Sequence, residues 1–289
     1  MTFLKPLGTR PWLIRLGWAS LIANIVLVLT GGAVRLSGSG LGCPTWPHCD
    51  NGSFVPQAAL GIHGAIEFTN RMLTFVLTVV AILTFISAWQ SARKELRWLA
   101  FWLAMFIPAQ AIIGGISVRT HLNPWVVSLH LISSMVIIGL AVVYIVRIDR
   151  PLPKPSALRW AQLIAAFAVL YLGTVVTGAG PHAGDAGREA TKYRNGFSPL
   201  QTAQLHTDFV FLLVGLTLAL LIIRRSPAVM ALFAAELFNA TIGFIQYFTH
   251  LPVVLVGIHM LGAAIVAATS TWVLLDDTAK SVDRQPSTA

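Results

Sequence analysis

Eight long apolar runs account for most of this 289-residue chain. Each run has about the 20 residues that an α-helix needs to cross the hydrocarbon core of a bilayer. Only 11% of the residues are charged, against about 25% in soluble domains, so the chain is predicted to be an all-α membrane protein with eight transmembrane helices. The runs fall at roughly 13–36, 63–90, 97–118, 124–147, 158–179, 202–223, 227–248 and 252–275.

The positive charges are divided unequally between the two sets of connections. Fourteen lysines and arginines lie on the side that carries both termini, and six lie on the other side. Because cytoplasmic loops are enriched in Lys and Arg, both termini are expected in the cytoplasm. No transit-peptide pattern precedes the first run, which favours a bacterial plasma membrane. The net charge of +9 is accompanied by no nucleic-acid motif, so membrane lipid is the expected surrounding and nucleic acid is not a partner.

An internal repeat divides the chain at the proline-rich segment 149–156. Three short matches share one offset of 129 residues: 111–114 with 240–243, 120–122 with 249–251, and 129–131 with 258–260. Four helices per half return the second half to the same orientation, so a repeat related by an axis along the membrane normal is expected. The prediction is two repeated four-helix bundles, residues 1–150 and 151–289.

A polar cluster begins the second apolar run. His63, Glu67 and Asn70 are spaced four and three residues apart, so on a helix they share one face. An acidic residue inside a membrane helix is costly to bury and is a functional-site hypothesis by default. Arg71 follows directly and is predicted to pair with Glu67 or with a haem propionate, since a guanidinium can bind a carboxylate through two hydrogen bonds. The alternative for Arg71 is an interfacial arginine.

Single histidines mark the other helices that run in the same direction. His130, His206 and His259 each lie about two turns from the outer end of their runs, so they are expected at similar depth. Histidines on facing helices of a bundle can hold haem. Each one alone could instead be an interhelical hydrogen-bonding group. Zinc is less favoured because it usually requires three or four close ligands.

The first external loop contains both cysteines of the chain. Cys43 and Cys49 lie in an oxidising compartment if the topology is right, so a disulfide is expected. A dithiol used in redox chemistry or haem handling is the alternative. A thioredoxin-like site would need two intervening residues and is excluded by the spacing.

Taken together, these features resemble the haem A synthase family, the membrane enzymes that convert haem O to haem A for cytochrome oxidases. The resemblance covers the two four-helix halves, the glutamate motif on the second helix, and the histidines on helices four, six and eight. It also covers two segments around the external loops, 31–40 and 177–185.

The resemblance implies that the N-terminal half binds haem O as substrate and that His206 and His259 hold haem b in the C-terminal half. It also implies that Glu67 takes part in the chemistry. The family pattern Glu-x-x-His-Arg is Glu67-Phe-Thr-Asn70-Arg71 here, so Asn70 replaces an expected ligand. Either His63 substitutes for that ligand, or His130 holds the substrate haem alone, which is slightly favoured because a substrate must enter and leave.

The implied function is oxidation of a ring methyl group of haem O to a formyl group. Two alternatives use the same histidines: a dihaem membrane cytochrome that passes electrons from quinol, and a haem transporter or chaperone. A haem O synthase and an electron acceptor are the implied partners, and a homo-oligomer is compatible with the sequence.

Overall fold

The computed structural model describes residues 5–50, 52–182, 184–185 and 194–276. Within these ranges the chain forms eight long α-helices, each long and apolar enough to cross a membrane. The predicted all-α, multi-pass membrane architecture is therefore confirmed, and each expected run lies within a few residues of its helix. The helices are α1 (Arg10–Leu36), α2 (Gly61–Gln90), α3 (Lys94–Arg119), α4 (Pro124–Asp149), α5 (Ala157–Ala179), α6 (Pro199–Ile223), α7 (Pro227–Phe248) and α8 (Val253–Leu274), with short 3₁₀ helices η1 (Lys5–Gly8) and η2 (Ala58–Leu60).

Local sequence explains where several helices begin. The side chains of Ser156, Ser198 and Ser226 each accept a hydrogen bond from a backbone N–H in the first turn of α5, α6 and α7. Such caps satisfy donors that have no partner within the helix. Proline opens α4, α6 and α7, where its missing N–H costs no helical hydrogen bond.

The turns before α4 and α8 share an unusual backbone. His121 and Leu122 have φ of 52° and 60°, and His250 and Leu251 have φ of 64° and 60°. Residues other than glycine seldom adopt this left-handed region. These residues belong to the two Thr-His-Leu segments that match at an offset of 129 residues, so two matched sequences form turns of the same kind.

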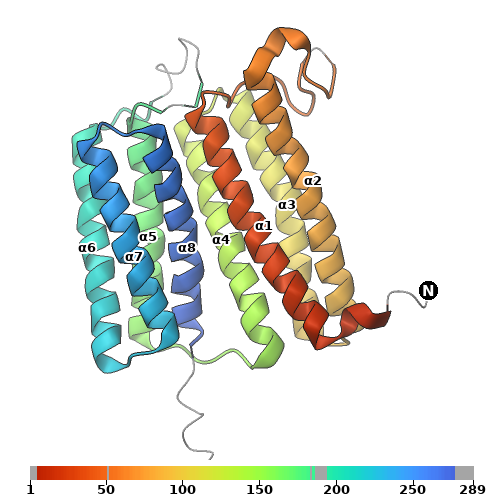
Figure 1. The fold of residues 1–289 in the computed structure, drawn as a ribbon, viewed down its shortest axis with the longest axis vertical. Helices are drawn as coiled ribbons and strands as arrows, with labels where there is room; N and C mark the ends of the chain where they lie inside the picture. The colour runs from red at the N-terminus through yellow and green to blue at the C-terminus, as the bar shows by residue number, and fades with distance from the viewer. Residues whose placement is uncertain (1–4, 51, 183, 186–193, 277–289) are drawn as a thin grey trace, which may run out of the picture.

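The helices pack as two groups of four that lie side by side (Figure 1). Helices α1 to α4 form one ring of contacts, in which α1 also touches α4, and α5 to α8 form another, in which α5 also touches α8. The groups meet through α1, α4, α5 and α8. The buried side chains of α4, among them Met135, Ile138 and Tyr144, pack in a core that also includes Ala264 of α8. The division into repeated halves at residue 150 stays a prediction.

The long loops join the two groups at the end opposite the termini. The backbone N–H of Gly40 donates to the carbonyl of Gly184 at 2.7 Å. Arg35, in the last turn of α1, donates to the carbonyl of His182 at 2.9 Å. At the other end, where the described termini lie (Figure 1), Arg10 pairs with Asp149 at 2.6 Å. Both ends of the bundle are thus tied by contacts between distant parts of the chain.

Candidate functional site

Glu67 and Arg71 form a buried ion pair on α2. The side chains are one turn apart, and Nη2 of Arg71 lies 2.5 Å from Oε1 of Glu67. Glu67 is only 6% exposed. Its second oxygen, Oε2, accepts a hydrogen bond from the backbone N–H of Cys43 at 2.6 Å. Both carboxylate oxygens therefore have donors, which is the condition under which a buried charge is tolerated.

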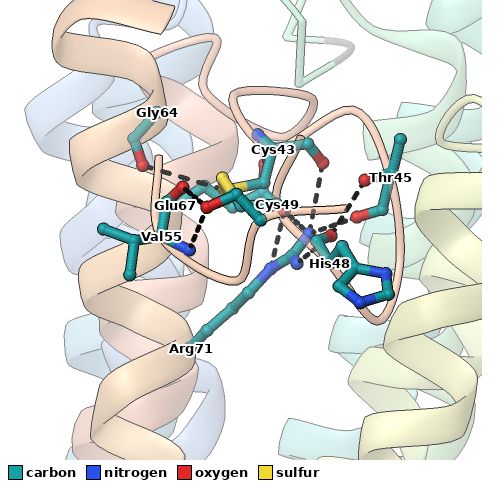
Figure 2. Close-up of a disulfide and its surroundings, with 9 residues drawn as sticks. Cys43, Thr45, His48, Cys49, Val55, Gly64, Glu67 and Arg71 are labelled. Atoms are coloured by element: carbon teal, nitrogen blue, oxygen red, sulfur yellow. Dashed lines mark hydrogen bonds and ion pairs between the residues drawn. A yellow bond between two sulfur atoms is a disulfide. The ribbon is translucent and has the colours of Figure 1, made fainter. Parts of the chain in front are cut away.

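Arg71 also holds the loop that contains the cysteines. Figure 2 shows its side chain extending from α2 into this loop, where it donates to the carbonyls of Cys43, Thr45 and His48, each at 3.2 Å. A guanidinium has five donors in a fixed plane, so it can serve several acceptors at once. The expected pairing of Arg71 with Glu67 is present, and the same side chain fixes the loop to α2.

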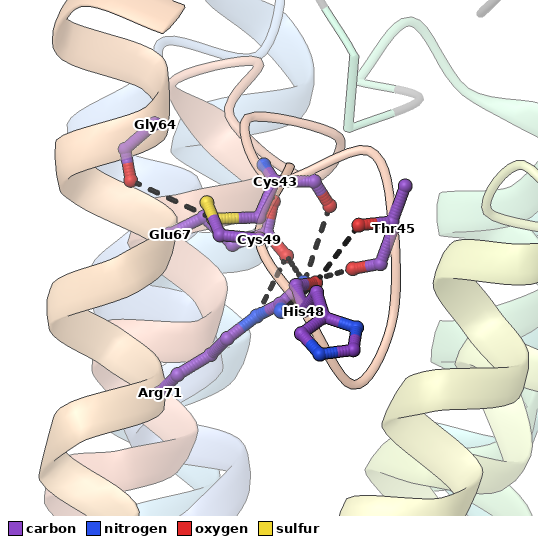
Figure 3. A network of polar contacts seen from close by, with 7 residues as sticks. All are labelled: Cys43, Thr45, His48, Cys49, Gly64, Glu67 and Arg71. Atoms are coloured by element: carbon purple, nitrogen blue, oxygen red, sulfur yellow. Dashed lines mark hydrogen bonds and ion pairs between the residues drawn. A yellow bond between two sulfur atoms is a disulfide. The ribbon is translucent and has the colours of Figure 1, made fainter. Parts of the chain in front are cut away.

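The cysteines form the expected disulfide, with Sγ of Cys43 2.05 Å from Sγ of Cys49. Both residues are fully buried. Figure 3 shows the disulfide beside Glu67 and Arg71, near the N-terminal end of α2. Of the two alternatives, the structure therefore contains the disulfide, and a dithiol would form only after reduction of this bond.

The cysteine loop extends from α2 across to α3. Its Trp46 ring packs on Gly115 of α3, where a Cβ would lie 2.4 Å from the ring. On the other side, Gly42 packs on the first turn of α2, where a Cβ would lie 2.1 Å from the carbonyl oxygen of His63. Two glycines thus allow the loop to lie directly on both helices.

The two remaining polar residues of the α2 motif have different surroundings. Nδ1 of His63 is hydrogen-bonded to the hydroxyl of Ser39 at 2.9 Å. Asn70 has a buried side-chain oxygen with no hydrogen-bond partner among the described residues. His63 is therefore engaged with the residues that follow α1, whereas Asn70 retains an unsatisfied polar atom inside the bundle.

His130 lies on α4 with an unpaired ring nitrogen. Its Nδ1 is buried and has no partner among the described residues. Its backbone carbonyl accepts hydrogen bonds from Ser134 at 2.9 Å and from Gln110 of α3 at 3.3 Å. A Cβ built on Gly114 of α3 would lie 3.4 Å from the imidazole, so the ring sits close against a residue without a side chain.

His206 and His259 face each other from α6 and α8. Their ring centroids are 6.5 Å apart and their planes are inclined by 75°. Nδ1 of His206 is hydrogen-bonded to the carbonyl of Val169 on α5, and Nδ1 of His259 to the carbonyl of Asn239 on α7, both at 3.1 Å. A carbonyl only accepts, so each Nδ1 must carry the proton, and each Nε2 keeps its lone pair. Histidines that bind a metal have this arrangement.

The carbonyls that orient these rings could not be identified from side-chain patterns, because a backbone acceptor leaves no residue signature. The glycines beside the rings, by contrast, can be recognised in the sequence. A Cβ on Gly243 of α7 would lie 3.1 Å from His259, and one on Gly173 of α5 would lie 3.3 Å from His206. Gly114 and Gly243 both belong to the repeated Ala-x-Ile-Gly segments.

The structure brings the predicted site residues together in pairs. Glu67 meets Arg71, and His206 meets His259, while His63 contacts Ser39 instead. Across the described residues, no three His, Cys, Asp or Glu side chains gather closely enough to hold a metal ion. A metal held by two histidines, as in a haem with two axial ligands, is compatible with these pairs.

Two arginines lie where the long loops join the two groups of helices, at the end opposite the termini. Arg35 donates to the carbonyls of Thr177 and His182, and Arg194 donates to the carbonyl of Pro181, between them. Nη1 of Arg194 is buried without a described partner, and burial lowers the pKa of this guanidinium. Arg35 and Arg194 thus place two cations against the segment 177–182. Arg119 is exposed at the end of α3.

Comparisons with known proteins identify relatives of this chain. A protein named "Heme A synthase" from Lysinibacillus sphaericus is 31% identical over 179 residues, which are 56% of this chain and 57% of the relative. Proteins of the same name from Staphylococcus epidermidis and Listeria welshimeri are 29% identical over 178 residues and 33% identical over 114 residues. They cover 56% and 38% of this chain, and 58% and 37% of their own lengths. These matches span less than two thirds of the relatives' lengths.

The family comparison extends further along the chain. The sequence model of the COX15-CtaA family, described as "Cytochrome oxidase assembly protein", matches residues 14–271. That range begins in α1 and ends in α8, and it includes every site residue described above. The chain, with its eight membrane helices, paired histidines and buried glutamate, therefore belongs to the COX15-CtaA family of cytochrome oxidase assembly proteins.

Proposed function

We propose that this protein is a haem A synthase that oxidises the methyl group of haem O to a formyl group. The relatives named above support the proposal, and one observation of this chain carries it. His206 and His259 face each other with their Nδ1 atoms bound to backbone carbonyls, which leaves two Nε2 lone pairs inside the second group of helices.

The pair fits haem b as the resident cofactor. Two imidazoles that bind one metal through Nε2, each at about 2 Å, have ring centroids roughly 6 Å apart. The observed separation is 6.5 Å. Haem b bound here would accept and pass on single electrons. The protein's own part is to fix both imidazoles through Val169 and Asn239, so that the ligands do not reorganise when the charge changes.

The substrate haem O is assigned to the first group of helices, with His130 as its ligand. The imidazole of His130 has no competing hydrogen bond among the described residues, whereas His63 is bonded to Ser39. This contrast favours His130 alone over a pair of His130 and His63. A single ligand leaves the opposite face of the site without an imidazole, which suits a substrate that must bind and dissociate.

Glu67 is the proposed catalytic carboxylate, and its contacts favour an electrostatic role. Arg71 and the Cys43 N–H donate to both oxygens, and donors of this kind stabilise the charged form of a carboxylate. A fixed negative charge stabilises positive charge that develops on the substrate as electrons leave. Arg71 is a positioning residue, and its one remaining N–H, on Nη1, is a candidate contact for a haem propionate.

The proposal also covers the membrane location of the protein and its partners. The lack of a transit-peptide pattern supports a bacterial plasma membrane, and the lysine and arginine bias supports termini in the cytoplasm, so that the disulfide would lie outside the cell. Haem O synthase would supply the substrate, and a further carrier would receive the electrons. Assembly into a homo-oligomer is compatible with the proposal. The two groups of helices would be repeats, residues 1–150 and 151–289, with one site each.

The test is to produce the protein in cells that make haem O and lack their own haem A synthase, and to extract the pigments. The unaltered protein is expected to yield haem A. Glu67→Ala and His206→Ala should leave haem O, whereas Glu95→Ala, which alters a half-exposed carboxylate on α3, should behave as the unaltered protein. Normal haem A from Glu67→Ala would refute the role of Glu67.

The same experiment separates the alternatives. A dihaem cytochrome would bind haem at His206 and His259 and leave haem O unchanged in every strain. A haem transporter or chaperone would exchange haem with added apoprotein and also leave the methyl group intact. Haem A formed by purified protein from added haem O would exclude both.

A further inference from the structure

A buried carboxyl group on α7 has no part in the function proposed above. Glu236 is only 4% exposed. Its Oε1 accepts a hydrogen bond from the hydroxyl of Thr217 on α6 at 2.8 Å, and its Oε2 has no partner among the described residues. An ionised carboxylate leaves Oε2 without a donor, whereas a protonated one could donate its O–H to the Thr217 hydroxyl, which accepts as well as donates. The same hydroxyl can thus serve both protonation states of the carboxyl group, and the unpaired Oε2 needs an explanation.

Glu236 belongs to a polar face of α7. Asn239, Gly243 and Gln246 follow it at intervals of three, seven and ten residues, so all four lie on one face of the helix. The side-chain oxygens of Asn239 and Gln246 are also buried and unpaired within the described residues. Unsatisfied buried oxygens incur a desolvation cost, which binding of a proton or a water molecule would relieve.

This face leads to the proposed haem b site. The carbonyl of Asn239 accepts the hydrogen bond from His259, and Gly243 lies against the His259 ring. Glu236 is seven residues from Gly243, about 10 Å along the helix, in the direction of the helix end that carries the termini. The carboxyl group is therefore within electrostatic range of the histidine pair and nearer to the proposed cytoplasmic surface.

The first group of helices has no acid at the corresponding position. At the offset of 129 residues, Gln110 corresponds to Asn239 and Gly114 to Gly243, but Ile107 corresponds to Glu236. The carboxyl group is thus present only in the half assigned to electron transfer.

The helices packed against α7 provide no countercharge at this level. From α6 the contact is Thr217, and the titratable groups of that helix, His206 and Asp208, lie toward its other end. From α8 the titratable group is His259. The nearest charges toward the other end are those of residues 224–225, after α6, and Asp276, after α8.

We propose that Glu236 is a proton-binding site that gains a proton when the second half accepts an electron and loses it when the electron leaves. The inference rests on the proposed haem b site. Uptake of one proton from the cytoplasmic side by the Glu236 carboxylate would balance one electron taken up by haem b at His206 and His259, and release of the proton would accompany loss of the electron, so that net charge within the bundle is conserved. In the proposed reaction the electron comes from the substrate methyl group. The physical reason is that added negative charge favours a proton nearby, because charges interact strongly where water is excluded.

The test is a redox titration of the purified, haem-loaded protein, followed by the haem absorption at a series of pH values with dithionite as reductant. The midpoint potential of the unaltered protein should fall as pH rises, because reduction takes up a proton. Glu236→Gln should abolish this dependence, and Glu95→Gln on α3 should retain it. Thr217→Val removes the donor that stabilises the carboxylate, so the pH range over which the midpoint potential changes should move upward.

A second measurement tests the same proposal if the Glu236→Gln protein does not accumulate in the cells. Reduced-minus-oxidised infrared spectra of the unaltered protein should show a protonated carboxyl band gained on reduction, and Thr217→Val should shift it. An unchanged pH dependence in Glu236→Gln, or the absence of any dependence in the unaltered protein, would overturn the inference and leave the haem site intact. A protein that binds no haem at His206 and His259 would instead overturn the proposed function.

Discussion

Gly243 lies against the imidazole of His259, so that a Cβ added to the glycine would be 3.1 Å from Cε1 of the ring. At this distance the neighbour must move, and the ring is already fixed by its hydrogen bond to Asn239. Gly243→Val is therefore expected to displace the imidazole and to abolish the low-spin spectrum of haem b in the purified protein.

Gly215 provides the matched control for Gly243. It lies in α6, and a Cβ built on it meets nothing within 4 Å. Gly215→Val makes the same chemical change within the same group of helices and should leave the haem spectrum unchanged. Equal loss of haem in both variants would mean that the effect comes from the helix and not from the ring contact.

Arg71→Gln is expected to loosen the cysteine loop. The change leaves Glu67 buried without its cation, which costs roughly 3 kcal/mol for a pair of this kind, and it weakens the contacts with three loop carbonyls. The loop should become more sensitive to protease, and Cys43 and Cys49 should react faster with thiol reagents after mild reduction. Arg119→Gln, at an exposed site at the same end of the bundle, should change neither rate.

Asn70→His is expected to add a second imidazole to the proposed substrate site. Asn70 has an unpaired buried oxygen, so the position has no hydrogen bond to lose. The variant should bind haem in the first group of helices more tightly, with a six-coordinate spectrum, and should release product more slowly. Thr69→His places the same ring on an exposed position of α2 and should leave both properties as they are.

His130 and His63 can be distinguished by paired substitutions. His130→Gln should abolish haem O binding by the first group of helices, as measured by the absorption of added haem. His63→Gln should reduce it little, because that ring is bonded to Ser39. Loss of binding in both variants would show that the two histidines act as a pair.

The sequence was sufficient to predict the helices and the ion pair, because both depend on local spacing. An apolar run of about 20 residues fixes a membrane helix, and a spacing of four residues places Arg71 beside Glu67. The disulfide could be expected because the two cysteines lie close together in one loop.

The contacts across the bundle could not be predicted from the sequence. The bond between His63 and Ser39 depends on how the loop after α1 returns to α2, and the carbonyls of Val169 and Asn239 carry no residue signature. Glu236 is a different case. An acid inside the apolar run 227–248 is the same signal that identified Glu67, and only its partner and its depth required the structure.

The absence of a side chain at Gly32 has a consequence for the spacing of the two groups of helices. A Cβ there would lie 2.7 Å from Cε of Met260, so a side chain at position 32 would displace the end of this methionine, which is flexible. Met260 directly follows His259. A bulky residue at position 32 would therefore move a side chain that adjoins the proposed haem b ligand, and would loosen the seam between α1 and α8 at that level.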